Sequence, residues 1–276
     1  MNAWTPILGR LRETFDDVAE RYHAARPGYP PEVVADLIRL ADLSVGSRVL
    51  EIGCGTGQLT VPVAAAGTRI TAVELGPALA AVARRRLAAY PDVRVVVGPF
   101  EDVPVPDGAF DLVVAATSFH WIDEAVRVEK SARALRPGGA LAIVDTHHVA
   151  GGTEGFFRDV QTCYEAWDPS TPPGLRLPAA DDIPTARPEL DSSPHFEPVQ
   201  LHRYAWTARY TTAEYRTLLL TYSSHLTLPL ERREALLGCI DSLIDERFGG
   251  AVTKRYLTEL RVARRRRHGV ARAASE

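Results

Sequence analysis

A glycine-rich segment behind a short apolar run is the part of this chain best suited to hold a ligand. Residues 49–52 are apolar except for Glu51, and three glycines follow at every second position, Gly53, Gly55 and Gly57. Glycine is needed where the backbone takes positive φ, or where a Cβ would keep a ligand from the main chain. A helical pattern begins after them, so the segment predicts a strand, a tight turn and a helix N-terminus that offers N–H groups to a nucleoside-containing ligand.

The same spacing argues against a dinucleotide. The dinucleotide fingerprint is Gly-x-Gly-x-x-Gly, and its last position would fall on Gln58. Glu51 lies just before the turn, where a carboxylate would repel a pyrophosphate but would suit a cationic ligand. The segment therefore predicts a site for a positively charged nucleoside derivative.

This combination resembles motif I of the class I S-adenosylmethionine-dependent methyltransferases, whose cofactor carries a sulfonium and no phosphate. The resemblance implies S-adenosyl-L-methionine as the cofactor and S-adenosyl-L-homocysteine as the product. It also implies that Glu51, Gly53, Gly55 and Gly57 shape the pocket around the methionine part of the cofactor.

An acidic residue ends the next apolar run of the chain. Glu74 follows residues 70–73, at about the separation from the glycine turn that is expected for an acid on the ribose hydroxyls. We expect Glu74 to accept hydrogen bonds from the ribose, with Leu75 beside it in the cofactor site. The alternative is a surface acid just past the end of a strand.

Residues 98–104 resemble the third motif of the family, in which a side chain after the third strand flanks the adenine. Phe100 is expected to stack on that ring, and Glu101 to accept a hydrogen bond from its amino group. The alternative is that Phe100 packs into the hydrophobic core. The family more often has a small residue at this position.

Residues 115–123 close the fourth strand, at the position that faces the transferred methyl group in the family. Thr117 is expected to contact the cofactor, and Phe119 and Trp121 to line the substrate pocket. His120 is the candidate catalytic residue, because a histidine near its ordinary pKa can take a proton from a hydroxyl acceptor. The alternative is that His120 only forms part of the pocket wall.

A second signature precedes the core. Tyr22, Arg26 and Tyr29, with Pro27 and Pro30, are similar to the Tyr-x-x-x-Arg-Pro-x-Tyr-Pro segment of the type 11, trans-aconitate-methyltransferase-like subgroup of small-molecule enzymes. The resemblance implies that this segment covers the cofactor. The guanidinium fork of an arginine suits a carboxylate, such as that of the methionine part. A surface helix followed by a proline exit is the alternative.

The elements that must position these residues alternate along the chain. Short apolar runs predict strands, and longer amphipathic stretches between them predict helices, so the pattern is that of an α/β protein with a parallel sheet covered on both faces. The predicted strands are 48–52, 69–73, 93–97, 111–115 and 140–144, and the predicted helices are 58–66, 77–89 and 122–135. Residues 135–139, Leu-Arg-Pro-Gly-Gly, resemble the family's helix stop and tight turn.

The resemblance implies a Rossmann-like class I methyltransferase fold. Its mostly parallel seven-stranded sheet has helices on both faces, an antiparallel last strand and a C-terminal lid or insertion. The two completing strands are expected at about 197–209 and 253–263. We expect an N-terminal cofactor-covering segment, a cofactor-binding core, an insertion with the completing strands, and a basic disordered tail, at 1–30, 31–150, 151–263 and 264–276 respectively.

Composition limits the partners and the compartment. The net charge of −3 gives no reason to expect nucleic acid, and no stretch approaches the ~20 apolar residues of a membrane span. Cys54, Cys163 and Cys239 are far apart and have no histidines at ligand spacing, so we expect no disulfide and no metal site. With no signal-peptide pattern either, the expected location is the cytoplasm.

The expected activity is methyl transfer to a small molecule by in-line displacement. The Asn/Asp-Pro-Pro-Tyr/Phe tetrapeptide and the Pro-Cys nucleophile of nucleic-acid methyltransferases do not occur in the sequence, so a carboxylate or hydroxyl of a small acceptor is favoured. Two alternatives stay open at this point. One is a non-catalytic cofactor-binding module, and the other is a nucleic-acid methyltransferase that uses the basic run at Arg264–Arg267.

Overall fold

The computed structural model describes residues 15–267, and the chain forms two compact units within it. Of the described residues, unit 1 contains 15–27 together with Thr146–Pro184 and Ala205–Leu257. Unit 2 contains Gly28–Asp145, Thr185–Tyr204 and residues 258–267. The chain therefore passes between the units several times, whereas the sequence predicted four consecutive segments, at 1–30, 31–150, 151–263 and 264–276.

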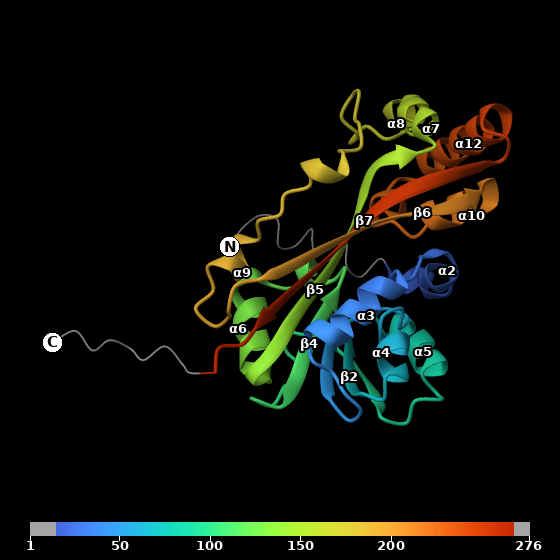
Figure 1. The fold of residues 1–276 in the computed structure, drawn as a ribbon. Helices are drawn as coiled ribbons and strands as arrows, with labels where there is room; N and C mark the ends of the chain where they lie inside the picture. Colours follow the sequence, from blue (N-terminus) through green and yellow to red (C-terminus); the bar gives the residue numbers. More distant parts are fainter. Residues whose placement is uncertain (1–14, 268–276) are drawn as a thin grey trace. The chain divides into compact units, whose positions relative to one another are not determined.

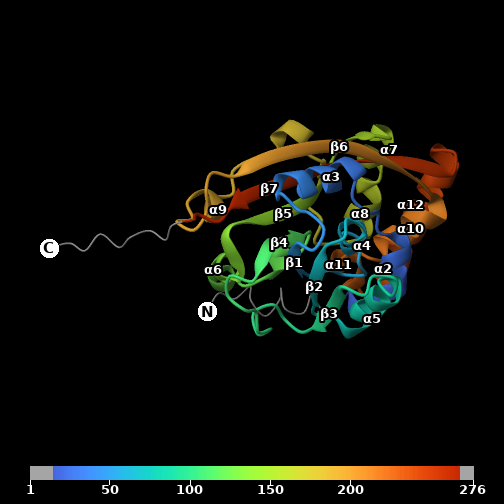
Figure 2. The same ribbon diagram turned by 60° about the horizontal axis from the view of Figure 1, so that its bottom comes forward.

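Seven strands form one sheet in the order β3-β2-β1-β4-β5-β7-β6 (Figures 1 and 2). The strands are β1 (Arg48–Ile52), β2 (Arg69–Glu74), β3 (Val93–Val97), β4 (Phe110–Ala116), β5 (Leu135–Gly152), β6 (Gln200–Thr211) and β7 (Ala251–Arg264). The pairs from β3 to β5 are parallel. The last strand is antiparallel to β5, because Gly138 donates to Arg265 and Arg265 donates back to Gly139.

The order of the strands reverses beside β1, and ligand sites in such sheets lie at the carboxyl ends of the strands near this point. The glycine turn follows β1 directly. The sheet thus places the residues after β1, β2 and β4 along one edge.

The register explains why each central strand is apolar on both faces. Leu112 and Val114 of β4 belong to one hydrophobic cluster, while Val113 and Ala115 belong to another on the opposite face. Neighbouring side chains of a strand point to opposite faces, so a strand covered on both sides needs apolar residues at every position. Both clusters lie in unit 2.

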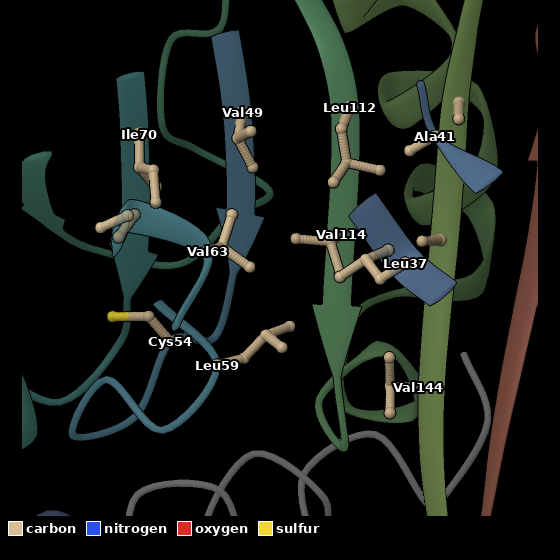
Figure 3. Close-up of a cluster of buried hydrophobic side chains, with 14 of the residues drawn as sticks. Leu37, Ala41, Val49, Cys54, Leu59, Val63, Ile70, Leu112, Val114 and Val144 are labelled. Atoms are coloured by element: carbon tan, nitrogen blue, oxygen red, sulfur yellow. The ribbon is translucent and has the colours of Figure 1, made fainter. Parts of the chain in front are cut away.

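Helices cover both faces of this part of the sheet. Side chains of α3 (Pro31–Leu40), α4 (Thr60–Ala65) and α5 (Pro77–Arg86) belong to the first cluster, and those of α6 (Glu124–Ala134) belong to the second. Figure 3 shows Leu37 of α3 and Val63 of α4 pointing toward the strands that carry Val49 and Val114. The predicted α/β class and seven-stranded sheet with an antiparallel last strand are confirmed.

The turn expected at 135–139 is instead part of β5. Phe110 pairs with Leu135 but Leu112 pairs with Ala140, so β5 holds additional residues in a bulge. A Cβ at Gly139 would lie 3.0 Å from the carbonyl oxygens of Arg136 and Asp111. The glycine therefore lets the bulge pack closely against β4.

Unit 1 has a hydrophobic cluster of its own. It is formed by residues of the ends of β6 and β7 and of four helices, among them Phe156, Tyr215, Leu236 and Tyr256. The helices of this unit are α2 (Ala19–Ala25), α7 (Glu154–Asp159), α8 (Gln161–Trp167), α10 (Thr212–Leu219), α11 (Ser223–Leu226) and α12 (Leu230–Arg247). The proline-rich stretch between β5 and β6 also holds η3 (Ala180–Asp182) and, in unit 2, the short helix α9 (Pro188–Asp191).

Two expectations about the C-terminal half need correction. Cys163 of α8 and Cys239 of α12 form a disulfide, with their Cα atoms 5.8 Å apart, although the spacing in the sequence gave no sign of it. The first residues of the basic run are not a free tail. Arg264 is the last residue of β7, and Arg265 forms an isolated antiparallel β-bridge with Phe196. The predicted tail from residue 268 onward lies outside the described residues.

Within residues 15–267, no helix has both the length and the apolar character that crossing a membrane requires.

Candidate cofactor-binding site

The turn after β1 is built from glycines that adopt left-handed backbone conformations. Gly53, Gly55 and Gly57 have φ values of 69°, 57° and 87°. A Cβ at Gly53 would lie only 2.5 Å from the Cβ of Ser118, so no other residue fits there without a shift. The prediction that this segment forms a tight glycine turn between a strand and a helix agrees with these positions.

The Glu74 carboxylate lies directly against this turn. One oxygen accepts a hydrogen bond from the Gly55 N–H at 2.7 Å, and the other accepts one from the Gly76 N–H at 2.9 Å. Only 6% of the Glu74 surface is exposed. A carboxylate has about four acceptor positions, so an acid at this place can hold the turn and also accept from a ligand hydroxyl. Glu74 is therefore a buried acid bonded to the glycine turn, and not the surface acid of the alternative interpretation.

Glu51 is a second acid beneath the turn, and it is 2% exposed. Burial raises the pKa of Glu51 to about 8, and the nearby Glu74 carboxylate raises it as well. Glu51 is thus largely protonated at neutral pH when no cation is close. A positive ligand beside it would favour the ionised form.

Cys54 lies inside the turn and is buried. Burial raises the pKa of the Cys54 thiol well above its usual range, with the two acids contributing in the same direction. The reactive form of cysteine is the thiolate. Cys54 therefore serves packing, as its small size in the turn suggested.

Thr117 follows β4 in a strained conformation. Its φ is 57°, and a β-branched residue rarely takes this left-handed region. Its hydroxyl forms a hydrogen bond of 3.1 Å with the Tyr29 hydroxyl, and its N–H donates to Val144 at 2.7 Å. Backbone strain of this kind is common at functional sites. Here the strained conformation is stabilised by these two hydrogen bonds, one from the side chain and one from the backbone of Thr117. The structure thus brings Tyr29 to the end of β4.

His120 lies in η2 (Phe119–Trp121), three residues after Thr117, and its side chain is exposed on one side and covered by protein on the other. Desolvation by the surrounding protein lowers its pKa, although Asp145 acts in the opposite direction, and Arg187 and Arg127 lower it further. The imidazole is therefore neutral at neutral pH, the form that accepts a proton. Its ring packs against Trp121, with ring centroids 4.8 Å apart.

Two predicted site residues are core residues instead. Phe100 is 3% exposed and belongs to the hydrophobic cluster that also holds Val73 and Phe110, which was the alternative interpretation of its role. Phe119 is fully buried in the same cluster, so it lines no substrate pocket. Both residues were predicted from their positions in family motifs. The sequence alone does not indicate whether either ring points into the site or into the core.

The loop that carries Phe100 and Glu101 is fixed by a lysine that the sequence analysis missed. Lys130 of α6 donates from Nζ to the carbonyl oxygens of Phe100, Glu101 and Val103, at 2.7 to 2.8 Å. Glu101 itself accepts from the Asp123 N–H at 3.2 Å. The side chain of Leu75 is half-buried just after Glu74. No pattern in the sequence links Lys130 to a loop about thirty residues earlier, so only the fold reveals this contact.

Ser118 is a second residue that motif reasoning overlooked. Its hydroxyl donates to the Ile52 carbonyl, and its Cβ occupies the space that a side chain at Gly53 would need. Ser118 thus connects the end of β4 to the glycine turn. The sequence signal for this role was slight: a small hydroxyl residue shortly after the end of the fourth predicted strand.

Tyr22 and Arg26 belong to unit 1, whereas Tyr29 belongs to unit 2. The Arg26 guanidinium donates to the Thr221 hydroxyl and carbonyl, at 2.9 and 2.8 Å. It also lies over the rings of Tyr22 and Tyr222, at 5.1 and 4.3 Å from their centroids. The role of Tyr22 and Arg26 toward a cofactor carboxylate stays a prediction.

Across the described part of the chain, no group of three or more histidine, cysteine or acidic side chains has a geometry that could hold a metal ion.

Comparison with known proteins gives a family likeness for the core of the chain. Residues 50–143 match the family model described as a methyltransferase domain, and this range contains the glycine turn, Glu74 and His120. This part of the chain is therefore similar to methyltransferase domains. The subgroup suggested by Tyr22, Arg26 and Tyr29 is not specifically confirmed.

Relatives among curated proteins extend the likeness beyond residues 50–143. An uncharacterized methyltransferase of Mycobacterium tuberculosis is 29% identical over 231 residues, which cover 84% of this chain and 85% of that protein. A malonyl-[acyl-carrier protein] O-methyltransferase of Serratia marcescens is 32% identical over 132 residues, which cover 48% of this chain and 50% of its own.

A solved structure supports the fold. Phosphoethanolamine N-methyltransferase 2 of Haemonchus contortus, solved with phosphomonomethylethanolamine and S-adenosylhomocysteine, superposes with a TM-score of 0.52 at 19% identity, covering 91% of this chain and 57% of that one. At this identity the likeness concerns the fold alone.

Proposed function

We propose that this methyltransferase moves the methyl group of S-adenosylmethionine to a carboxylate or hydroxyl oxygen of a small molecule by in-line displacement. The observation that carries the proposal is the contact between the Glu74 carboxylate and the Gly55 N–H within a turn of three left-handed glycines. The name of one relative, which matches half of the chain, specifies O-methylation and supports oxygen as the acceptor atom.

The residues of the turn fit the proposed cofactor. The Glu74 carboxylate lies beside the turn, where an acid can accept from ribose hydroxyls, and Gly53 and Gly55 are only partly buried, so a ligand can approach their backbone. S-adenosylmethionine, when bound, supplies a methyl group on a positively charged sulfur. Glu51 would hold that charge, because the site can release its proton when a cation arrives.

The main task of the protein is then to align donor and acceptor. Thr117 is fixed by Tyr29 and by the Val144 carbonyl, so the chain after β4 has a defined conformation at the edge where the acceptor must approach. Glu101, Leu75 and Trp121 flank the same edge of the sheet, after β3, β2 and β4 respectively. Alignment of this kind needs no covalent step on the enzyme.

His120 is the proposed base for acceptors that carry a proton. Its lowered pKa keeps the imidazole neutral, so it accepts the proton that a phenol or alcohol loses. A carboxylate acceptor is already ionised and needs no base. His120→Gln is therefore expected to slow the methylation of hydroxyl acceptors and to leave a carboxylate acceptor unaffected.

The nucleic-acid alternative loses its main support. Arg264 donates to the carbonyl oxygens of Gly138 and Leu40, and Arg265 donates to that of Leu135. These guanidinium groups are engaged inside unit 2, so half of the basic run is not a free surface for phosphates. A small-molecule acceptor stays the favoured partner.

Isothermal titration with S-adenosylhomocysteine tests the proposal. Binding to the wild type, weakening in Glu74→Ala and no binding of NAD are the expected results. NAD binding, or equal affinity in both proteins, would contradict the cofactor assignment. If the cofactor product binds, an acceptor screen that follows its release then separates an enzyme from a non-catalytic module.

A further inference from the structure

A buried lysine of unit 1 lies among aromatic rings without an acidic partner. Lys254 of β7 is 4% exposed, and its Nζ lies 5.6 to 5.9 Å from the ring centroids of Phe157, Tyr215, Tyr222 and Tyr256. Among the residues that the structure describes, its ammonium has no recorded hydrogen bond and no ion pair. A buried charge without compensation is costly, so buried lysines are normally paired.

The other charged group near this lysine is also positive. The Arg26 guanidinium lies 4.3 Å from the centroid of Tyr222, the ring that Lys254 also approaches. Burial and, to a smaller extent, the Arg26 guanidinium together lower the pKa of Lys254 to about 7. The Lys254 ammonium and the Arg26 guanidinium thus lie near the same tyrosine ring, and neither has an acidic side chain beside it within residues 15–267.

His148 adds a third basic group to this cluster. Its Nε2 lies 3.4 Å from the Tyr222 hydroxyl, and its ring meets those of Tyr222 and Tyr256 at 5.3 and 5.6 Å between centroids. Burial lowers the pKa of His148 well below its usual range, and Lys254 and Arg26 act in the same direction. A neutral histidine and the tyrosine hydroxyls add polar groups next to the unpaired ammonium.

We propose that Lys254, Arg26 and His148, with the rings of Tyr222 and Tyr256, form a binding site for the carboxylate of a small organic acid with an aromatic or apolar body. The ammonium and guanidinium supply the charge, and the rings supply an apolar surface for the rest of the molecule. The site lies wholly within unit 1. It assigns the Arg26 guanidinium to this acid in place of the cofactor carboxylate predicted from the sequence, and it leaves the Glu74 and glycine-turn assignment unchanged.

A carboxylate fits this cluster better than an inorganic phosphate. Phosphate sites converge several N–H donors on one anion, often with backbone N–H groups at a helix N-terminus. Arg26 already directs two of its donors to Thr221, and the remaining lining is mostly aromatic. The cluster therefore has charge for one anionic group and an apolar surface for its body.

Proton uptake should accompany binding. Near pH 8 the Lys254 amine is mostly neutral in the free protein, and a bound carboxylate stabilises its ammonium form. The titratable and charged groups near it are Arg26, His148, His225 and the three tyrosines 215, 222 and 256. Within this cluster, Lys254 is the group whose pKa allows a change of protonation near pH 7 to 8.

The test uses the full chain without any cofactor, so its outcome is separate from that of the proposed function. Trp206 reports binding by fluorescence, because it stacks on Tyr256 with ring centroids 4.5 Å apart. The probes are benzoate, phenylacetate and trans-cinnamate, with benzamide as the neutral analogue of benzoate and inorganic phosphate as the simple anion. We expect saturable binding of at least one acid and about tenfold weaker binding of benzamide and phosphate.

Lys254→Met removes the charge at similar length, and Arg232→Gln removes a positive charge from an exposed position of α12 in the same unit. We expect about tenfold weaker acid binding in Lys254→Met and no change in Arg232→Gln. Calorimetry of the wild type at pH 8, in two buffers of different ionisation enthalpy, should show proton uptake. This second measurement decides the matter if Lys254→Met does not fold.

Three results would overturn the proposal. These are equal affinity for benzoate and benzamide, acid binding without proton uptake, and no saturation with any of the three acids. Tighter binding of phosphate than of every acid would instead assign the cluster to an inorganic anion, which also contradicts it.

Discussion

The Glu74 carboxylate accepts a hydrogen bond from the Gly55 N–H across nineteen residues of sequence, at 2.7 Å. This contact joins the end of β2 to the turn after β1, so the acid that closes the glycine turn is also the one proposed to bind the ribose. A change at Glu74 therefore affects the shape of the turn as well as the ligand contact.

Glu74→Gln is expected to weaken S-adenosylhomocysteine binding by about tenfold or more, because an amide offers one acceptor oxygen in place of two. Isothermal titration measures the dissociation constant. Asp107→Asn is the matched control, since Asp107 is exposed and pairs only with the exposed Arg133 in the same unit. Equal affinity in wild type and Glu74→Gln would remove Glu74 from the ribose assignment.

Gly53→Ala is expected to destabilise unit 2 and to abolish cofactor binding. The new Cβ would lie 2.5 Å from that of Ser118, in addition to the strain of a φ of 69°. Gly46→Ala is the control, because Gly46 has a similar φ of 84° but no atom within 4 Å of its added Cβ.

Urea unfolding separates these two effects. Gly46→Ala should cost about 1 kcal/mol from backbone strain, and Gly53→Ala about 1 to 3 kcal/mol more. Ser118→Gly in the Gly53→Ala background should recover part of the difference. Equal losses in both single variants would show that the contact with Ser118 does not matter.

Backbone features of the site could be predicted from the sequence, because glycine spacing and strand ends depend on local chemistry. The glycine turn and Glu74 lie where their motif positions suggested. The orientation of aromatic rings depends on packing between distant elements. Phe100 and Phe119 were for this reason expected in the site, although both belong to the core.

The pairing of distant elements was also beyond the sequence. Cys163 and Cys239 are 76 residues apart, and only the packing of α8 against α12 brings them together. Lys254 looked like an ordinary strand residue, because a lysine in a sequence is far more often exposed than buried. Lys254 lies within the strand predicted at about 253–263, but the sequence gives no sign that the first part of this strand belongs to unit 1 and is buried there.

The stability of the free protein should depend on pH through Glu51. In the unfolded chain Glu51 releases its proton near its ordinary pKa of 4.5, whereas burial keeps it protonated in the native state up to about pH 8. The native state therefore binds more protons between these values, and the free energy of unfolding falls as the pH rises through this window. Its contribution is on the order of 1.4 kcal/mol per pH unit before other groups are counted.

Glu51→Gln removes this titration, so the variant should lose less stability than the wild type between pH 5 and pH 8. Urea unfolding at several pH values measures the difference. An identical pH dependence in the two proteins would show that Glu51 is ionised in the native state.

The Cys163–Cys239 disulfide should stabilise unit 1 in the isolated protein. It closes a loop with a sequence separation of 76, and a link of this length is expected to contribute about 2 to 4 kcal/mol, chiefly by restricting the unfolded chain. Reductant should lower the free energy of unfolding of the wild type by this amount. Cys239→Ser is the control, since its stability should not respond to reductant. Thiol titration of the denatured, oxidised protein should find one free thiol, that of Cys54, and three free thiols would contradict the bond.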